Sequence, residues 1–303
     1  MGNGPAPFSE IGKRARDLLT KDYNYDQKFS LSTPSSTGMG LTATGVKKDQ
    51  IFVGDISTQY KSGKATVDVK VDTYSNVSTK VTYNVVPSTK AAISFRVPDH
   101  KSSKLDVHYL HHHAAINSSI GLYPSPLLEV AAAIGSKGIA IGGEIGFDTS
   151  SSSFTKCNAG ISYNKPDFSA ALILYLKNLF ALDDYFTTEI SAFAQGTVLS
   201  YKTDKGQTVK ASYLHLVNPL TGTEVAVEMT HRLSGFANSF SIGSVHKIDK
   251  LTSVGTRFSD DGKFAILSRR EWRPKSFATF SAEYDTKAIN VAPKFGLSIA
   301  LKP

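Results

Sequence analysis

The chain alternates between apolar and polar residues at every second position, in segments of roughly 8 to 12 residues, from about residue 26 to its end. In segment 65–72, an alanine and three valines occupy one face, and Thr66, Asp68, Lys70 and Asp72 occupy the other. The same period recurs in segments 77–85, 91–97, 104–109, 155–163, 208–213, 224–230 and 294–301. A period of two is that of a β-strand whose two faces meet different surroundings. The pattern therefore predicts an all-β protein.

Short glycine-containing sequences such as 61–64, 135–138 and 260–263 separate these segments. Turns of this length join neighbouring strands as antiparallel hairpins. We count about 19 candidate strands in one run, more than a soluble β-sandwich contains. No motif repeats with the period of a β-propeller. The sequence therefore predicts a closed, antiparallel β-barrel of about 19 strands over residues 26–303.

A barrel of this many strands is too wide for its own side chains to fill. Both strand faces are satisfied if the valine and aromatic side chains meet lipid and the polar side chains line a water-filled lumen. No stretch approaches the roughly 20 apolar residues that a spanning helix requires. The expected architecture is therefore a transmembrane β-barrel pore.

Residues 1–25 break the two-residue period and read as a short amphipathic helix with its linker. Its apolar stripe consists of Phe8, Ile11, Ala15, Leu18 and Leu19. The helix is too short to span a bilayer, so it either lies on a membrane surface or docks inside the barrel. The segment also lacks the apolar core of a secretory signal peptide, which disfavours a bacterial outer-membrane route.

The chain has 34 Lys and Arg against 26 Asp and Glu, and this balance of +8 favours anionic partners. The basic residues are dispersed rather than gathered in runs, which argues against nucleic acid. On the predicted lumen face and on the helix, they give the candidate pore-lining residues Lys13, Arg14, Arg16, Lys21, Lys70, Lys80, Arg96, Lys104, Lys156, Lys210, Arg257 and Lys294. Their modest excess over carboxylates predicts weak anion selectivity from a diffuse positive potential.

The sequence gives little support for a disulfide, a metal site, a nucleotide-binding motif or a catalytic site. The single cysteine, Cys157, excludes an internal disulfide and a multi-cysteine metal site. The run His111–His113 has no Cys or carboxylate at ligand spacing, so no metal is predicted. The glycines do not match nucleotide-binding motifs, and no serine has the context of a hydrolase nucleophile. We expect neither an enzyme nor a cofactor.

Several blocks of the sequence, namely LHHHAAINSSIGLYPSP, VNPLTGTEVAVEMTH, EWRPKSF and DTKAINVAPKFGLSIALKP, resemble the plant voltage-dependent anion channels of the mitochondrial outer membrane. Since mitochondrial members of this family have 19 strands, our count is not independent of the resemblance. The resemblance implies a voltage-gated, anion-preferring pore for adenine nucleotides, phosphate and organic acids, with the helix in the lumen acting in gating. It also implies homo-oligomers and docking of a hexokinase-type partner.

The closing segment 294–301 resembles the sorting signal of mitochondrial barrels, carried by Lys294, Gly296, Ile299 and Leu301. Two departures from the family are expected. The linker Asp22–Tyr25 replaces the glycine-rich hinge of animal members, which makes free swinging of the helix doubtful. The segment at about 175–195 reads as an insert that adds zero or two strands, because one strand would invert every later face.

Two other functions stay open from the sequence alone. A barrel of this kind could import polypeptides, although such translocases carry longer terminal extensions. A soluble all-β binding protein would show the same alternation with its apolar face turned inward.

Overall fold

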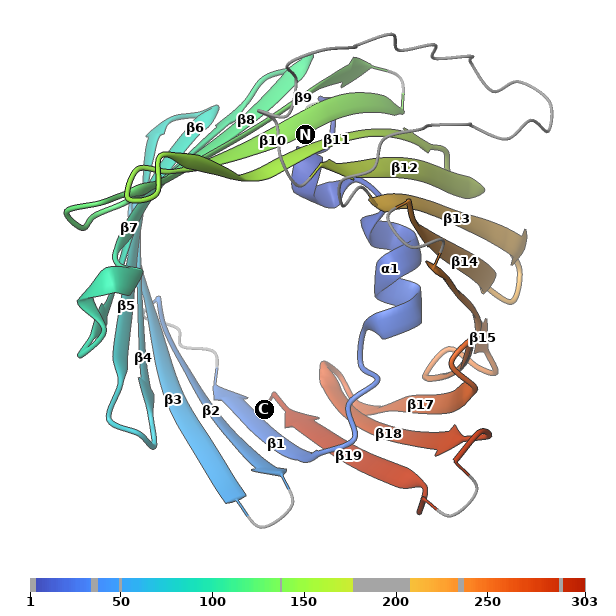
Figure 1. Ribbon diagram of the computed structural model, residues 1–303. Helices are drawn as coiled ribbons and strands as arrows, with labels where there is room; N and C mark the ends of the chain where they lie inside the picture. The colour runs from blue at the N-terminus through green and yellow to red at the C-terminus, as the bar shows by residue number, and fades with distance from the viewer. Residues whose placement is uncertain are drawn as a thin grey trace, which may run out of the picture.

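The computed structural model describes residues 4–33, 38–48, 51–136, 138–176, 208–233, 237–288 and 291–302. They form one 19-stranded β-sheet that closes on itself, with a short helix inside the ring (Figure 1). The predicted all-β barrel and its strand count are confirmed.

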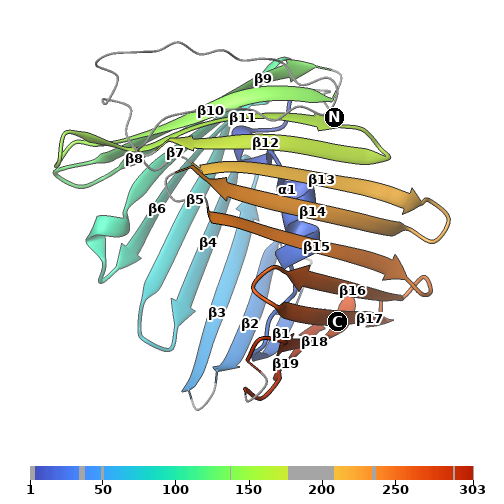
Figure 2. The same ribbon diagram turned by 45° about the vertical axis from the view of Figure 1, so that its right-hand side comes forward.

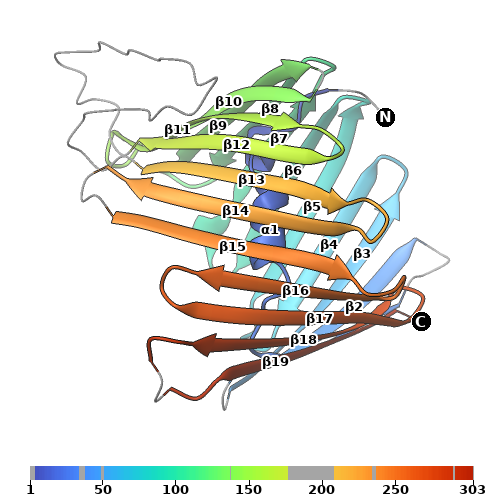
Figure 3. The same ribbon diagram turned by 90° about the vertical axis from the view of Figure 1, so that its right-hand side faces the viewer.

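The strands follow one another around the ring in chain order. They are β1 (Gln27–Thr33), β2 (Met39–Lys48), β3 (Ile51–Ser62), β4 (Ala65–Asp72), β5 (Val77–Val86), β6 (Thr89–Val97), β7 (Lys104–Leu110), β8 (Ala114–Gly121), β9 (Leu127–Ser136), β10 (Ile139–Asp148), β11 (Ser153–Asn164), β12 (Phe168–Leu176), β13 (Thr208–Asn218), β14 (Thr223–Arg232), β15 (Ala237–Lys247), β16 (Thr252–Ser259), β17 (Lys263–Arg273), β18 (Ser276–Asp285) and β19 (Lys294–Leu301). Each is antiparallel to the next, as Figures 2 and 3 show along the front wall.

The seam between β1 and β19 corrects the prediction of a wholly antiparallel barrel. These strands pair in parallel, with Gln27 opposite Leu297 and Leu31 opposite Leu301. In an up-and-down ring with an odd number of strands, the first and last must run in the same direction. The parallel seam is the consequence, and it leaves neither strand with a free edge.

The expected N-terminal helix is present, and a 3₁₀ turn precedes it. A 3₁₀ turn, η1 (Phe8–Glu10), is followed by α1 (Lys13–Thr20), and a second 3₁₀ turn, η2 (His100–Ser102), lies between β6 and β7. Gly12 separates η1 from α1 with φ of 68°, in the left-handed region that glycine adopts without strain. The break lets both pieces follow the curved wall.

The apolar stripe of the N-terminal segment docks against the inner wall of the barrel. Phe8, Ile11, Ala15 and Leu19 are all buried. Phe8 and Ile11 cluster with Ala133, Ala171 and Ile173, and Ala15 and Leu19 cluster with Leu214 and Ala226. Of the two placements that the sequence allowed for the helix, the structure has the one inside the barrel.

The docked helix identifies which strand face is the inner one. Ile173 and Leu214 touch it, so their positions face inward, and strand pairing extends this assignment around the ring. Lys80 faces inward by the same alternation, whereas Phe95 and Leu297 face outward and remain 43% and 46% exposed. Among the described residues, no helix is both long and apolar enough to cross a bilayer.

Candidate functional site: the lumen wall

The inner wall of the barrel is wet. The side chains of Lys70, Lys104 and Lys156 all face inward, yet they are 53%, 51% and 50% exposed. A packed protein interior would not leave ammonium groups so accessible, because an unsolvated charge is strongly destabilising. Water therefore reaches the inner face, as expected of a pore.

Most of the predicted pore-lining cations have carboxylate partners. The pairs are Lys13–Glu10 (2.5 Å), Lys70–Asp55 (3.2 Å), Arg96–Asp72 (3.4 Å), Lys104–Asp106 (3.4 Å), Lys156–Glu129 (2.6 Å), Lys210–Glu228 (2.8 Å) and Arg257–Glu283 (2.9 Å). A close pair largely cancels its own field at the pore axis. These residues therefore contribute less to the lumen potential than a count of cations suggests.

The other five candidates form no ion pair with a carboxylate in the part of the chain that the structure describes: Arg14, Arg16, Lys21, Lys80 and Lys294. Arg14 donates to the carbonyl of Lys165 at 3.0 Å, and a carbonyl leaves its charge uncompensated. Lys294 lies opposite Glu283 across the β18–β19 pair. Lys80 lies opposite Asp68 across the β4–β5 pair without forming an ion pair with it. Among the predicted pore-lining cations, those without an ion pair are therefore Lys80, Lys294 and three on the helix and its end.

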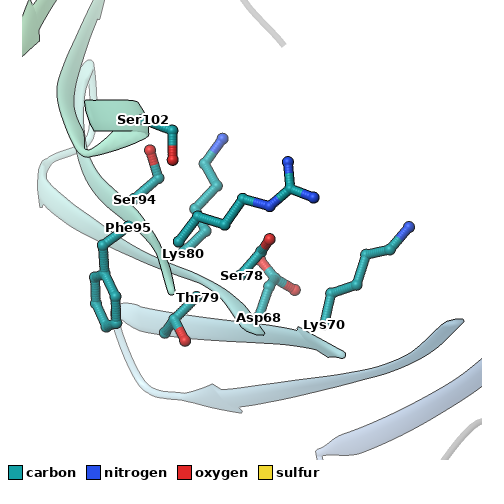
Figure 4. A pocket seen from close by; sticks show the side chains of 9 residues that line it. Asp68, Lys70, Ser78, Thr79, Lys80, Ser94, Phe95 and Ser102 are labelled. Atoms are coloured by element: carbon teal, nitrogen blue, oxygen red, sulfur yellow. The ribbon is translucent and has the colours of Figure 1, made fainter. Parts of the chain in front are cut away.

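Three predicted cations meet on the wall formed by β4, β5 and β6 (Figure 4). Lys70, Lys80 and Arg96 line a shallow hollow of about 260 Å³, while Phe95 points to the other side of the sheet. The one carboxylate among the lining residues, Asp68, accepts a hydrogen bond from Gln59 at 2.7 Å. Such a surface can attract a passing anion but has no enclosed pocket to retain it.

The far end of the N-terminal segment is held by a cluster centred on Arg257. Its Nη1 donates to the carbonyl of Leu19 at 3.1 Å, and its Nη2 donates to Glu283 at 2.9 Å. The hydroxyl of Tyr25 donates to the same Glu283 oxygen at 2.8 Å. The side chains of Arg257 and Glu283 are only 17% and 9% exposed, so this ion pair is mostly shielded from water.

Three further contacts fix the linker between α1 and β1. Arg269 pairs with Asp22 at 3.0 Å, and the Arg257 guanidinium lies 4.8 Å from the ring centre of Tyr23. The hydroxyl of Ser281 donates to the carbonyl of Asn24. We call these contacts, together with the Arg257 cluster, the linker latch. The linker is thus pinned to β16, β17 and β18, which supports the doubt about a freely swinging helix.

Burial raises the pKa values of the two linker tyrosines. It raises the pKa of Tyr23 from 10.0 to about 12, against the opposing effect of Arg257. Burial, reinforced by the hydrogen bond to Glu283, also raises the pKa of Tyr25. Because both pKa values are raised in the folded state, the latch is intact below pH about 10 and is lost as the pH rises through the folded values.

An alkaline titration checks this assignment. We expect the tyrosinate absorbance of the native chain minus that of Tyr23→Phe to titrate as one group with a midpoint of about 12. The corresponding difference for Tyr25→Phe should also lie above an ordinary tyrosine. A midpoint near 10 for Tyr23, as in an exposed phenol, would contradict its placement under Arg257.

Sequence reasoning missed most of the latch. It selected Arg257 as a pore-lining cation but not its partner Glu283, and it overlooked Arg269 and the roles of Tyr23 and Tyr25. Arg269 shares its parity with the inward-facing Ala265 and Leu267, so the alternation could have found it. The tyrosines belong to no strand, and no periodicity could have placed them.

The predicted sorting segment is β19. Lys294 and Gly296 face inward, whereas Ile299 and Leu301 face outward beside Phe29 and Leu31 of β1. A Cβ at Gly296 would overlap the Asn24 carbonyl, so this glycine has a structural reason to be present as well. Its role in sorting stays a prediction.

Two other sequence features were followed into the structure. Within the described residues, no group of three or more His, Cys, Asp or Glu side chains is placed to hold a metal ion. At the β7–β8 turn, the ring of His111 lies beside the rings of His112 and His113. Of the expected insert at 175–195, only Tyr175 and Leu176 are described, as the end of β12, and the remainder lies outside the described residues.

Comparison with known proteins agrees with this geometry. A family model described as eukaryotic porin matches residues 4–181 and 185–296, so its second segment begins within the expected insert. Mitochondrial outer membrane protein porin 6 of Oryza sativa subsp. japonica is 53% identical over 304 residues, and porin 4 of Arabidopsis thaliana is 52% identical over the same length. Both alignments cover 100% of each chain. A mutant of the Rh. blastica porin aligns over 84% of this chain and 91% of its own, at 7% identity and a TM-score of 0.47, too low to support a shared detail.

Proposed function

The chain belongs to the eukaryotic porin family, and from that premise we propose that it is a voltage-gated, weakly anion-selective channel for adenine nucleotides, phosphate and organic acids. Porins of this family are channels and not enzymes, and this one is a β-barrel of the mitochondrial outer membrane that passes small metabolites. The alternatives of a polypeptide importer and of a soluble binding protein lose their support.

The observation that carries the proposal is the exposure of ionic side chains on the inner face, such as that of Lys70, which is 53% exposed. A hydrated passage lined by both signs of charge admits small ions and metabolites with little binding. The unpaired cations then bias its contents toward anions without creating a site. This is selectivity by potential rather than by coordination.

Lys80 is the residue to test, because it forms no ion pair in the described residues, although Asp68 lies opposite it across the β4–β5 pair. A unit charge about 10 Å away in water contributes about 0.4 kcal/mol, which changes local anion concentration by at most about twofold. We therefore expect Lys80→Gln to lower the anion-to-cation permeability ratio by at most this factor, measured as the reversal potential in a salt gradient. Lys47→Gln, which removes an outward-facing charge on β2, is the control. A native channel that prefers cations at neutral pH would overturn the proposed selectivity.

We further propose that gating does not begin with the helix leaving the wall. The buried apolar stripe packs α1 against β13, β14 and β15. The linker latch holds the C-terminal end of α1 to β16 and β18. A voltage-driven change would then move the helix together with this part of the wall. The positive charge of the helix would then remain in the lumen in both the open and the closed state of the channel.

Two properties rest on resemblance and stand as proposals alone: homo-oligomers and docking of a hexokinase-type partner. The division into an N-terminal segment 1–25 and a barrel domain 26–303 has the same status. Each can be tested separately from the conductance.

A further inference from the structure

Four neighbouring hairpins gather basic charge at one rim of the barrel. Every odd-numbered strand ends at the rim where β19 ends, so the turns 165–167, 219–222, 248–251 and 274–275 lie side by side there (Figure 3). The cations on these turns and on the end of β17 are Lys165, Lys250, Arg270, Arg273 and Lys275. None of them forms an ion pair with a carboxylate in the described part of the chain.

Two of these cations lie on the outer side of the wall. The ammonium of Lys165 is 5.3 Å from the ring centre of Tyr163 and 5.6 Å from that of Phe168. Arg270 follows Arg269, which reaches the linker in the lumen, so by alternation Arg270 faces outward. Their charge is therefore directed toward the membrane and away from the pore.

The carboxylates on these turns and on the end of β17 are Asp167, Asp249 and Glu271, and Glu271 accepts a hydrogen bond from the backbone N–H of Lys275 at 2.7 Å. Hydrogen bonds from the backbone N–H groups of Leu251 and Thr252, at 2.7 and 2.6 Å, already engage Asp249. Arg270 adds only a minor part to the lowering of the Asp249 pKa, after these hydrogen bonds. The five cations therefore keep an excess over the three carboxylates at this rim.

Large apolar side chains project from the same place. Leu220 is 97% exposed, Ile248 64%, Trp272 58% and Leu251 54%. Trp272 occupies the position skipped in the register between β17 and β18. Apolar and aromatic side chains beside Lys and Arg are the combination found where a protein meets a lipid headgroup layer.

The opposite rim has a different character. There, cations and carboxylates lie side by side: Asp261 pairs with Lys263 at 2.5 Å, Lys287 donates to the carbonyl of Asp260 at 2.7 Å, and Asp99 lies on the same turn as Lys101. The contrast is not a general property of barrel ends, because both rims would meet headgroups equally. It points to a difference between the two leaflets.

We propose that the basic hairpin belt, defined as Lys165, Lys250, Arg270, Arg273 and Lys275 with Leu220, Ile248, Leu251 and Trp272, binds anionic phospholipid headgroups of the leaflet at this rim. The apolar side chains anchor the turns at the hydrocarbon boundary, and the Lys and Arg groups pair with lipid phosphates. Charge complementarity selects this occupant over zwitterionic lipid. Anionic lipid is therefore enriched around the barrel in one of the two leaflets.

Trp272 offers a built-in reporter, because it is the only tryptophan of the chain. The full chain is reconstituted in phosphatidylcholine vesicles, and its fluorescence is quenched with brominated phosphatidylglycerol or, at the same mole fraction, brominated phosphatidylcholine. We expect anionic lipid to be preferred near Trp272. The preference should fall about two- to fivefold per cation removed and should weaken with salt.

The variant Lys250→Gln with Arg270→Gln removes one turn cation and one outward strand cation of the belt. Its matched control, Lys101→Gln with Lys47→Gln, removes the same kinds of charge near the opposite rim. The proposal requires the preference to be lost in the first variant and kept in the control. Equal quenching by both lipids in the native chain would overturn the proposal, and so would an equal loss of the preference in both variants. The absence of quenching, expected if a second copy of the chain covers the belt, would overturn it as well.

Discussion

Replacing Arg257 by glutamine should detach the linker and expose the N-terminal segment to protease. Removing one partner of a shielded, hydrogen-bonded ion pair costs about 3–5 kcal/mol, because the other charge is left uncompensated. Here that charge is Glu283, which would keep only its hydrogen bond from Tyr25. We expect tryptic cleavage within α1, measured on the channel in vesicles, to accelerate by roughly a hundredfold or more.

The matched control is Arg269→Gln, which also removes an arginine that holds the linker. Its pair with Asp22 is 36% and 37% exposed, and exposed pairs contribute about 0–1 kcal/mol. Cleavage should therefore rise by about fivefold at most. If both variants were cleaved at the same rate, the buried Arg257 cluster would not be what holds the helix.

A lysine on the outer face of β6 should destabilise the barrel in the membrane, whereas a lysine at the next position should not. Ile93 lies in the middle of the strand, faces outward and is 47% exposed. A lysine at the bilayer midplane costs about 2–4 kcal/mol. We expect Ile93→Lys to lower the free energy of unfolding from vesicles by this amount, measured by urea titration.

Ser94→Lys is the control, since Ser94 faces the lumen beside Lys80 and Arg96. It should leave the free energy of unfolding nearly unchanged and should increase the preference for anions. The opposite order of stabilities would mean that the two faces of β6 have been exchanged.

The alternation along β4 and β6 was sufficient to predict their two faces, because every residue there obeys one period and one rule of solvation. The parallel seam was not foreseen, although it follows from counting: an odd number of up-and-down strands leaves β1 and β19 in the same direction. The break at Gly12 was missed because the spacing of Phe8, Ile11 and Ala15 fits one continuous helix. Only the curvature of the wall distinguishes the two.

The site was harder to predict than the fold. Strand parity places Lys70 and Lys80 in the lumen, but it does not show that Lys70 pairs with Asp55 while Lys80 forms no ion pair among the described residues. That distinction depends on register between strands. The linker latch is even harder to predict from the sequence, because it joins Tyr25 to Glu283, which are 258 positions apart in the chain. Pairings of such range are set by closure of the whole ring and leave no local trace.

The central claim is that neighbouring side chains of one strand face water and lipid in turn, and Thr79 and Lys80 of β5 test it most directly. Cys157→Ser first removes the single native thiol. Cysteine is then placed at either position, and a charged, membrane-impermeant thiol reagent is added during planar-bilayer recording. The account predicts a stepwise change in conductance with Lys80→Cys and none with Thr79→Cys. A change with Thr79→Cys and none with Lys80→Cys would contradict it.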